Sequence, residues 1–233
     1  MVTLYAVKFS DEWPDEFLKS HIMNQPISER EKILKYRQKK DRIQSLVGIM
    51  LIKYIIAEHL GVQPSLIVIN RDKYGRPYCS MTQWKGDFNL SHSGEWVILS
   101  ISEKCKVGVD IEKMNNISME ITNYFLTEKE QRNLYNGKGN DLIKDFYKLW
   151  TLKESYVKLI GLGLSYPLNS FEFEIKTKEE CQELIKVHDY NNNLEAVYFK
   201  IYNDLEGYTL ALCSNTKKLP SKIEIINLET IFE

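Results

Sequence analysis

Hydrophobic and polar residues alternate along some segments of the chain and recur at helical spacing along others, which predicts a mixed α and β structure. Strands are expected near residues 3–9, 66–69, 88–90, 96–102, 107–112, 171–175, 196–202 and 208–213. Helices are expected at 28–61, bent or split, at 118–125, from 127 onward and at 145–160. The order β, α, β therefore occurs twice, and the second half resembles the first.

Polar residues at the expected helix ends support these boundaries. Ser28 with Glu31, and Thr127 with Glu130, have the spacing of a capping box. Gly161 is suited to end the helix at 145–160. The segment 136–140 has the composition of a flexible turn and not of a phosphate-binding loop.

The charge balance argues against a dedicated nucleic-acid binder. The chain has 31 Lys and Arg against 32 Asp and Glu, a formal net charge of −1. Basic residues are concentrated only at 30–42, so any anion site is local. The most apolar stretch, 49–57, contains Lys53 and is far shorter than the roughly 20 residues that span a bilayer, so no membrane span is expected.

The cysteines and the N-terminus favour a cytoplasmic protein. The four cysteines are widely spaced and form no metal-binding motif, which favours a reducing compartment. The first residues lack the basic and apolar regions of a signal peptide.

The expected strand at 107–112 presents two carboxylates on one face. Because side chains alternate along a strand, Gly108, Asp110 and Glu112 point the same way. Oxygen ligands beside a glycine that leaves room for a ligand suit a hard cation such as Mg²⁺. A solvent-facing strand gives the same pattern, so the strand alone does not decide between the two interpretations.

The expected helix at 145–160 carries Phe146, Trp150, Glu154 and Lys158 on one stripe, because they recur every four residues. One interpretation is a surface Glu–Lys pair beside a core tryptophan. The other is a third metal carboxylate with a cation for a ligand.

The polar segment at 89–94 and several basic residues suit an anionic ligand. Ser91 and His92 are neighbours on a strand and point to opposite faces, so a phosphate contact is more economical than a catalytic dyad. Lys73 and Arg76, with the basic stretch at 30–42, offer cations to phosphates. The alternative for that stretch is a solvated helix face.

Four segments together resemble the motif set of the Sfp-type 4′-phosphopantetheinyl transferases. They are Lys-Tyr-Gly-Arg-Pro at 73–77, Phe-Asn-Leu-Ser-His-Ser at 88–93, Gly-Val-Asp-Ile-Glu at 108–112 and Trp-Thr-Leu-Lys-Glu-Ser-Tyr-Val-Lys at 150–158. Their order and spacing also match, and the resemblance extends from the first strand to about Cys213. It implies an α+β fold, a pseudo-dimer of two similar lobes at 1–106 and 107–233 that form one structural unit, with the active site in the cleft between them. It also implies a monomer.

The resemblance implies transfer of the 4′-phosphopantetheine arm of coenzyme A to a serine of an acyl or peptidyl carrier protein, with release of adenosine 3′,5′-bisphosphate. Asp110, Glu112 and Glu154 would then hold Mg²⁺, with Mn²⁺ as an alternative, and Lys158 would stabilise or protonate the leaving group. Either Glu154 or a water on the metal would accept the serine proton.

By the same matching, the residues around coenzyme A would be Lys32, Ser45, Lys73, Arg76, Ser91, His92 and Lys153. The chain departs from several relatives at Glu29, where they carry a lysine, so part of the 3′-phosphate site is in question; Arg30 and Lys35 are the candidate substitutes. The segment 114–125 lies in the region that docks carrier proteins in this family, although its apolar residues fit a helix core equally well.

Two other classes of function remain open at this point. The first is an inert module that binds a nucleotide or an acidic protein, and the second is another Mg²⁺-dependent enzyme, such as a phosphohydrolase. For the transferase, the pathway expected is nonribosomal peptide or polyketide synthesis, with fatty acid synthesis as the alternative.

Overall fold

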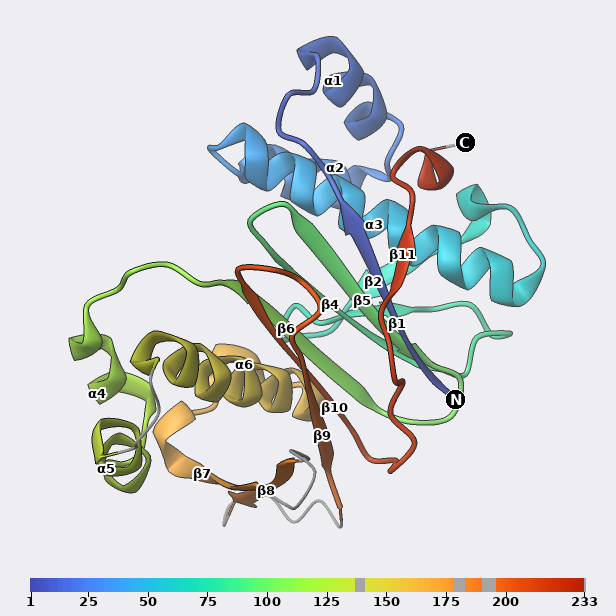
Figure 1. Cartoon of the computed structure of the whole chain (residues 1–233). Helices are drawn as coiled ribbons and strands as arrows, with labels where there is room; N and C mark the ends of the chain where they lie inside the picture. The colour runs from blue at the N-terminus through green and yellow to red at the C-terminus, as the bar shows by residue number, and fades with distance from the viewer. Residues whose placement is uncertain (137–140, 178–182, 190–195, 233) are drawn as a thin grey trace.

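Two sheets that share a core make up the centre of the molecule (Figure 1). The computed structural model describes residues 1–136, 141–177, 183–189 and 196–232. The first sheet has the order β11-β1-β5-β4 and the second β6-β10-β9. Their strands are β1 (Val2–Lys8), β4 (Asp87–Ser93), β5 (Trp96–Ser102), β6 (Val107–Lys113), β9 (Tyr198–Tyr202), β10 (Tyr208–Ser214) and β11 (Glu224–Ile226).

The two lobes repeat one topology. In each, the first strand pairs antiparallel with the last, and the last pairs with the middle one, giving β1-β5-β4 and β6-β10-β9. A long helix precedes the second strand of each sheet: α3 (Lys39–Leu60) in the first lobe and α6 (Leu142–Ile160) in the second. The expected α+β fold of two similar lobes is confirmed.

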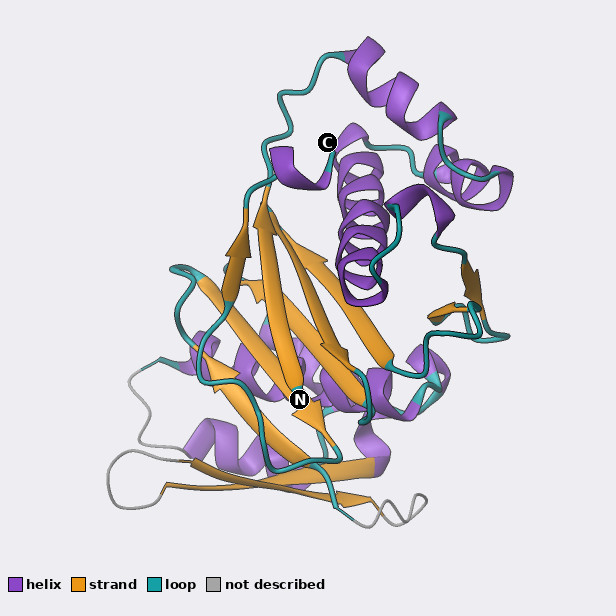
Figure 2. Cartoon of the chain, turned by 90° about the vertical axis from the view of Figure 1, so that its right-hand side faces the viewer, coloured by secondary structure: helices purple, strands orange, loops and turns teal. Residues whose placement is uncertain are grey.

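The remaining elements lie around this frame (Figure 2). The helices are α1 (Asp15–Met23), α2 (Ile27–Lys35), α4 (Thr122–Phe125) and α5 (Glu128–Asn136). Two small antiparallel pairs are β2 (Ile69–Arg71) with β3 (Pro77–Cys79), and β7 (Phe171–Thr177) with β8 (Glu183–Asp189). The first pair extends the first lobe, and the second packs on α6 through the aromatic rings of Tyr156, Phe171 and Phe173.

Helix α3 packs on the first sheet with most of its length buried. Ile43, Leu46, Val47, Leu51 and Ile56 are completely inaccessible to solvent. By length and composition alone, this helix could cross a membrane. However, 67% of its apolar 18-residue stretch is buried inside the protein. Such burial is typical of a core helix.

The helix expected at 28–61 is split, because Tyr36 adopts an extended conformation between α2 and α3. Ser28 does not cap α2, which begins after Pro26. The capping box at α5 is confirmed: the Glu130 carboxylate accepts from the Thr127 N–H at 2.9 Å, and the Thr127 hydroxyl accepts from the Glu130 N–H at 3.2 Å. The turn expected at 136–140 lies mostly outside the described residues.

The lobe boundary at 106/107 separates β5 from β6, but the end of the chain crosses it. Strand β11 pairs in parallel with β1, with Tyr5 opposite Glu224. Beyond it, Ile231 is buried in the core of the first lobe. The expected bounds of the second lobe, 107–233, are therefore wrong at the C-terminal end, because the tail packs in the first lobe. The sequence near β11 does not indicate this pairing, because its partner β1 is at the other end of the chain.

A row of polar side chains joins the two sheets where β4 runs beside β6. Alternate residues of β4 accept hydrogen bonds from backbone N–H groups of β6 at 2.9–3.4 Å: Asp87 from Val107, Asn89 from Val109, Ser91 from Ile111 and Ser93 from Lys113. Side-chain oxygens thus satisfy the β6 edge where a neighbouring strand would otherwise pair with it. We call this row the side-chain ladder.

Candidate active site

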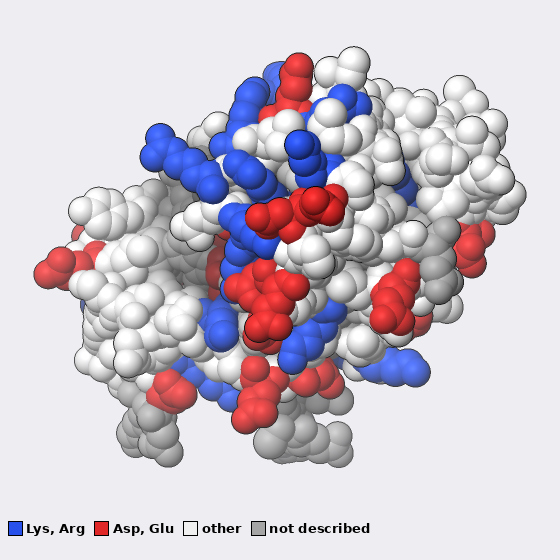
Figure 3. Space-filling model, turned by 90° about the horizontal axis from the view of Figure 1, so that it is seen from above, with Lys and Arg blue, Asp and Glu red and all other residues white. Residues whose placement is uncertain are grey.

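A pocket of about 450 Å³ opens between the lobes. Seen from above, the surface is hollowed there, with basic side chains along one rim and acidic atoms inside (Figure 3). Eight of the residues expected from the sequence line it: Lys32, Ser45, Ser91, His92, Asp110, Glu112, Glu154 and Lys158. They come from α2, α3, β4, β6 and α6, so the fold brings together residues far apart in the sequence.

Asp110 occupies the inner wall of the pocket and is 3% exposed. Its Oδ1 accepts hydrogen bonds from the Ser91 hydroxyl at 2.8 Å and from the Lys158 ammonium at 2.6 Å. Its Oδ2 is buried and has no hydrogen-bond partner among the residues that the structure describes. Because a buried polar atom without a partner is costly, Oδ2 is suited to a further ligand. Burial raises the pKa of the Asp110 carboxyl even though Lys158 opposes the shift.

Glu112 and Glu154 stand beside Asp110, and the three form what we call the carboxylate group. Glu112 accepts from the Ser93 hydroxyl at 3.0 Å and from the Trp150 indole at 3.3 Å. Burial, then repulsion by Asp110, raises the pKa of Glu112. The same two causes raise the pKa of Glu154 to about 7. Three carboxylates in one walled space repel one another, which favours protonation or a cation.

Basic side chains make up another part of the wall. Lys32 of α2 and Arg71 of β2 line the pocket, and we call them the cation pair. Burial, then the charge of Arg71, lowers the pKa of Lys32. His92 lines the same pocket, where the charges of Lys158, Asp41 and Lys32 act on it. Loss of water contact within the pocket, and then the charge of Lys158, lowers the pKa of His92 to about 4. The ring is therefore neutral at neutral pH.

Gly108 makes room for helix α6 and not for a ligand, which corrects the expectation from the sequence. A Cβ at this position would collide with the Ser155 carbonyl and with the backbone of Leu159. The close approach places α6 directly against β6. It brings Lys158 to Asp110 and Trp150 to Glu112.

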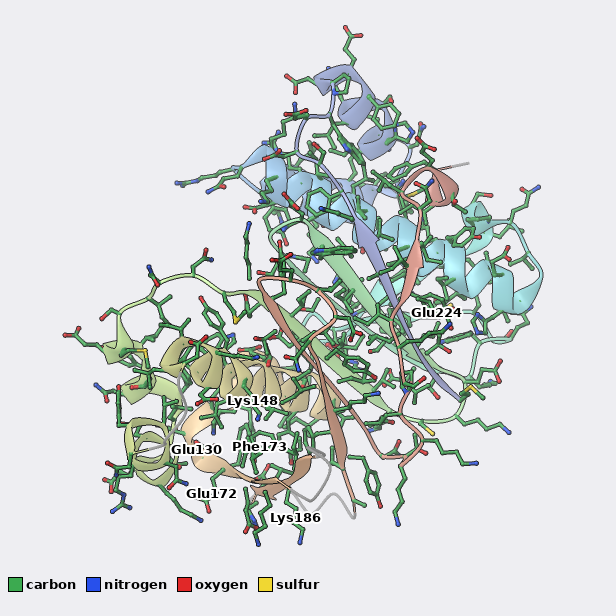
Figure 4. The ribbon with its side chains drawn as sticks, viewed as in Figure 1. Glu130, Lys148, Glu172, Phe173, Lys186 and Glu224 are labelled. Atoms are coloured by element: carbon green, nitrogen blue, oxygen red, sulfur yellow. The ribbon has the colours of Figure 1, made fainter. Side chains whose placement is uncertain are left out.

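Lys153 does not reach the pocket, so the expected phosphate contact is wrong for this residue. Its side chain is fully buried on the other side of α6, where the ammonium lies 2.8 Å from Glu130 and donates to the carbonyls of Leu168 and Phe171. Glu130 lies beside Phe173 of β7 in this lobe (Figure 4) and accepts from its N–H at 2.9 Å. The periodicity of the helix contained this signal, because Lys153 is off the stripe that carries Glu154 and Lys158.

Arg76 and Lys73 line a different hollow, formed by the turn at 72–76 and the end of α6. The Arg76 guanidinium forms an ion pair with Asp87 at 2.9 Å and donates to the carbonyls of Val107 and Lys158. It therefore ties the lobes together. Lys73 is exposed, and its ammonium lies over the Tyr74 ring. Neither contacts the carboxylate group.

Part of the segment 114–125 packs in the core, and part of it is exposed and could bind a partner. Phe125 is 4% exposed and packs edge-on against Trp150 at 4.5 Å, so it belongs to the core. Met114, Ile117 and Met119 pack against the same cluster. The Ile121 side chain is 40% exposed and the Tyr124 side chain 80% exposed. Together they form an apolar surface on the second lobe.

Sequence reasoning did not select Arg71 or Tyr36, both of which line the pocket. Arg71 comes from a three-residue strand, and its side chain forms an ion pair with Glu29 of α2. Tyr36 sits at the break between α2 and α3. Each carried a weak signal: Arg71 lies two residues before the 73–77 motif, and Tyr36 is inside the basic stretch.

The donor set of the carboxylate group fits a divalent cation. Among the described residues, no three His, Cys, Asp or Glu side chains are already gathered closely enough to hold an ion. The side chains that face this part of the pocket nevertheless offer carboxylate oxygens, the ligands that Mg²⁺ and Mn²⁺ prefer. The buried Asp110 Oδ2 without a partner supplies an oxygen that such an ion would satisfy.

Two family models cover most of the chain. Residues 12–104 match the model described as 4′-phosphopantetheinyl transferase, N-terminal, and residues 106–213 match the 4′-phosphopantetheinyl transferase superfamily. The chain belongs to this family. The Bacillus subtilis (strain 168) 4′-phosphopantetheinyl transferase Sfp is 32% identical over 202 residues, 87% of each chain, which confirms the Sfp-type resemblance and identifies the protein as a transferase.

Further relatives of this transferase family agree. The 4′-phosphopantetheinyl transferase gsp of Aneurinibacillus migulanus is 33% identical over 198 residues, 85% of this chain and 78% of that protein. Among solved structures, the Thermotoga maritima holo-[acyl-carrier-protein] synthase matches 47% of this chain and 61% of its own with 19% identity and a TM-score of 0.38. That partial match adds nothing to the assignment.

Proposed function

We propose that this phosphopantetheinyl transferase moves the 4′-phosphopantetheine arm of coenzyme A to a serine of an acyl or peptidyl carrier protein and releases adenosine 3′,5′-bisphosphate. The observation that carries the proposal is one pocket between two lobes, to which the second lobe contributes the carboxylate group and Lys158 and the first lobe the cation pair. Such a division suits a long ligand with several phosphates, of which only one is attacked.

In the proposed reaction, the serine hydroxyl attacks the phosphorus that carries the pantetheine arm, and the bond from that phosphorus to the bridging oxygen of the pyrophosphate breaks. The serine loses its proton, and the bisphosphate leaves with the bridging oxygen. Glu154, which faces the same pocket, is suited to accept that proton, with a water molecule as the alternative acceptor. The Lys158 side chain is 26% exposed at the pocket wall, and its ammonium is suited to stabilise the negative charge on the departing phosphate.

Asp110, Glu112 and Glu154 are the residues that would hold Mg²⁺. When bound, the ion neutralises charge on the phosphoryl oxygens and acts as a Lewis acid. The protein contributes the orientation of these carboxylates: Ser91 and Lys158 hold Asp110, while Ser93 and Trp150 hold Glu112. Ser91 is therefore a positioning residue for Asp110 as well as a wall of the pocket.

The apolar surface of Ile121 and Tyr124 is the proposed docking area for the carrier protein. It belongs to the second lobe, between β6 and α5, on the segment that follows the carboxylates of β6. A carrier placed there would present its serine toward the carboxylate group. Nonribosomal peptide or polyketide synthesis is the proposed pathway.

The proposal includes a reducing, cytoplasmic location. Cys79, Cys105 and Cys213 are free thiols, as expected in such a compartment. The fourth cysteine, Cys181, lies outside the described residues.

The deciding experiment is intact-mass spectrometry of apo peptidyl and apo acyl carriers after incubation with the protein, coenzyme A and Mg²⁺. We expect a mass gain of one phosphopantetheine arm, abolished by a chelator. Glu112→Gln is expected to slow the gain by about 10²-fold or more because it removes a charged ligand. Glu206→Gln, an exposed residue outside the pocket, is the matched control and should be unaffected.

The same reactions distinguish the other functions. Release of inorganic phosphate from coenzyme A without a carrier would indicate a phosphohydrolase. Binding of coenzyme A without product on either carrier would indicate a binding module, and either result would overturn the proposed transfer.

A further inference from the structure

Side chains of both lobes hold the turn between β4 and β5. From the first lobe, Gln44 of α3 donates to the Gly94 carbonyl at 3.2 Å. From the second lobe, the Tyr208 hydroxyl of β10 accepts from the Glu95 N–H at 3.1 Å. Gly94 has a φ of +58°, which favours glycine, and a Cβ at this position would overlap the Tyr208 hydroxyl oxygen. The tyrosine ring therefore lies directly against the turn.

The residue before this turn connects it to the carboxylate group. Ser93 is the last residue of β4, and its hydroxyl donates to Glu112 Oε2 at 3.0 Å and accepts from the Lys113 N–H at 3.0 Å. The other hydrogen bond to Glu112, from the Trp150 indole, is longer at 3.3 Å. Ser93 is also the last member of the side-chain ladder. Its placement against Glu112 therefore depends on what holds the turn that follows it.

Tyr208 is fixed to the strand that carries Glu112. Strands β10 and β6 are antiparallel neighbours, with Thr209 of β10 opposite Glu112. Because side chains alternate along a strand, Tyr208 and Glu112 lie on opposite faces of the sheet, and the tyrosine does not contact the carboxylate. Strand pairing fixes the backbone of Tyr208, its hydroxyl fixes the turn, and Ser93 completes the connection back to β6. These contacts close a loop that includes both lobes.

Packing alone does not account for the hydroxyl of Tyr208. The residue is 7% exposed in the core between the two sheets, where a phenylalanine would also fill the space. Tyr202 of the same core is 3% exposed, and its hydroxyl donates to the Pro220 carbonyl at 2.7 Å. That contact leads to the segment before β11 and not to the carboxylate group. The two tyrosines therefore form a matched pair.

We propose that Tyr208 is a positioning residue for Glu112: its hydroxyl fixes the turn that places Ser93 against this carboxylate. The inference rests on the proposed function in one respect, because it takes Glu112 as a ligand of the divalent cation. Tyr208 is not among the described residues that line the pocket, so it acts through its neighbours. Groups that orient a metal ligand directly typically account for about 10- to 100-fold in metal affinity or activity. An effect passed on through the turn is expected to be smaller.

The test measures binding of Mn²⁺ alone to the full-length protein, by the loss of the free-ion EPR signal, and the Mg²⁺ concentration that gives half-maximal transfer to an apo carrier. Tyr208→Phe keeps the ring and removes the acceptor of the Glu95 N–H. We expect it to raise the Kd for Mn²⁺ and the Mg²⁺ requirement by about threefold or more, with the KM for coenzyme A at saturating Mg²⁺ changed by less than about twofold. Hydrogen exchange in the turn at 93–95, measured by mass spectrometry, should become faster. Tyr202→Phe is the matched control and should leave all four quantities unchanged.

A double variant tests the route through Ser93. If Tyr208 acts on Glu112 through this residue, Tyr208→Phe should weaken Mn²⁺ binding by less than about 1.5-fold in a Ser93→Ala background. An equal loss in both backgrounds would show that the tyrosine acts by another route and would overturn the inference.

The remaining outcomes separate this inference from the proposed function. Unchanged Mn²⁺ affinity and Mg²⁺ requirement in Tyr208→Phe would overturn the inference alone. An equal loss in Tyr202→Phe would also overturn it, because it would indicate a general loosening of the core; thermal unfolding of both variants measures that loosening directly. A wild-type protein that modifies no carrier, while Tyr208→Phe still weakens Mn²⁺ binding, would overturn the proposed function alone.

Discussion

His92 shows how the charge state of one side chain depends on the walls around it. The ring lines the pocket together with Lys158 and Lys32, and the charge of Asp41 acts on it in the opposite sense. Its surroundings disfavour the imidazolium and lower its pKa to about 4. A neutral ring offers phosphates one N–H donor and adds no third cation to a wall that already holds two.

This environment gives a pH-dependent prediction. Between about pH 4 and 6.5 the unfolded chain binds a proton at His92 that the folded protein does not bind, so the free energy of unfolding should fall as the pH is lowered through this range. In His92→Gln this part of the pH dependence should disappear, as measured by urea unfolding at pH 7, 6 and 5. Histidine NMR signals should give a midpoint below pH 5 for His92; a midpoint near 6.5 would contradict the argument.

Glu154 and Lys153 are adjacent in the sequence and have opposite roles, which illustrates what a residue pattern can establish. The four-residue spacing placed Glu154 and Lys158 on one stripe of the helix, the resemblance assigned that stripe to the site, and both residues line the pocket. Lys153 was assigned to a phosphate by resemblance to a motif, but its direction on the helix takes it to Glu130. Helical phase was the better guide. The partner of Lys153 could not be foreseen, since it is supplied by another helix.

At the scale of elements, the contact between β6 and α6 determines the position of the site. Asp110 and Glu112 come from one, Glu154 and Lys158 from the other, and Gly108 lies at the point of closest approach. The strand and the helix were both expected from the sequence. The close approach between them could not be predicted. It depends on the lack of a side chain at Gly108, whose neighbours Ser155 and Leu159 lie about fifty residues away in the sequence.

Gly108→Ala tests this contact. The added Cβ would meet backbone atoms of Ser155 and Leu159, which cannot turn aside, so we expect a loss of about 1–3 kcal/mol in the free energy of unfolding. Displacement of α6 should also move Lys158 away from Asp110 and reduce the transfer rate. Urea unfolding and the carrier assay measure the two effects.

Val109→Ala is the matched control for this change. Val109 is fully buried on the opposite face of β6, so its truncation lowers stability without pushing on α6. Its transfer rate should stay close to that of the wild type. Equal loss of rate in both variants would show that general destabilisation, and not the displacement of α6, explains the effect.

The side-chain ladder shows a second limit of sequence reasoning at this scale. The sequence analysis assigned the polar segment at 89–94 to an anionic ligand. In the structure Ser93 accepts a hydrogen bond from the backbone of Lys113, and Asn89, 4% exposed, does so for Val109. Ser91 does both, since it also lines the pocket. A polar stretch can serve a ligand or a neighbouring strand, and only the packing of the lobes decides between them.

At the scale of the whole molecule, the C-terminal tail closes the first lobe. Ile231 is 3% exposed in its core, and Phe232 packs edge-on against Trp13 with ring centroids 5.4 Å apart. The last residues thus hold the segment that leads into α1. The repeated β, α, β order was readable from the sequence, whereas this return of the tail was not.

Two isoleucines of the tail provide a matched pair of variants. Ile231→Ala is expected to lower the free energy of unfolding by about 2–5 kcal/mol, because it removes a buried side chain from a filled core. Ile225→Ala, 58% exposed on β11, should change it by less than about 0.5 kcal/mol. Denaturant unfolding monitored by tryptophan fluorescence would measure both. Similar values for the two variants would mean that the tail does not support the lobe as described.

The repeated topology of the lobes has a consequence for how the pocket acquired two unlike parts. In an assembly of two identical subunits, a twofold axis would repeat every residue of one wall on the other. Joined in one polypeptide, the two copies of the fold are free to differ: the first supplies Lys32 and Arg71, the second Asp110, Glu112 and Glu154. A bound molecule therefore meets a different chemistry at each of its ends and has only one way round to fit.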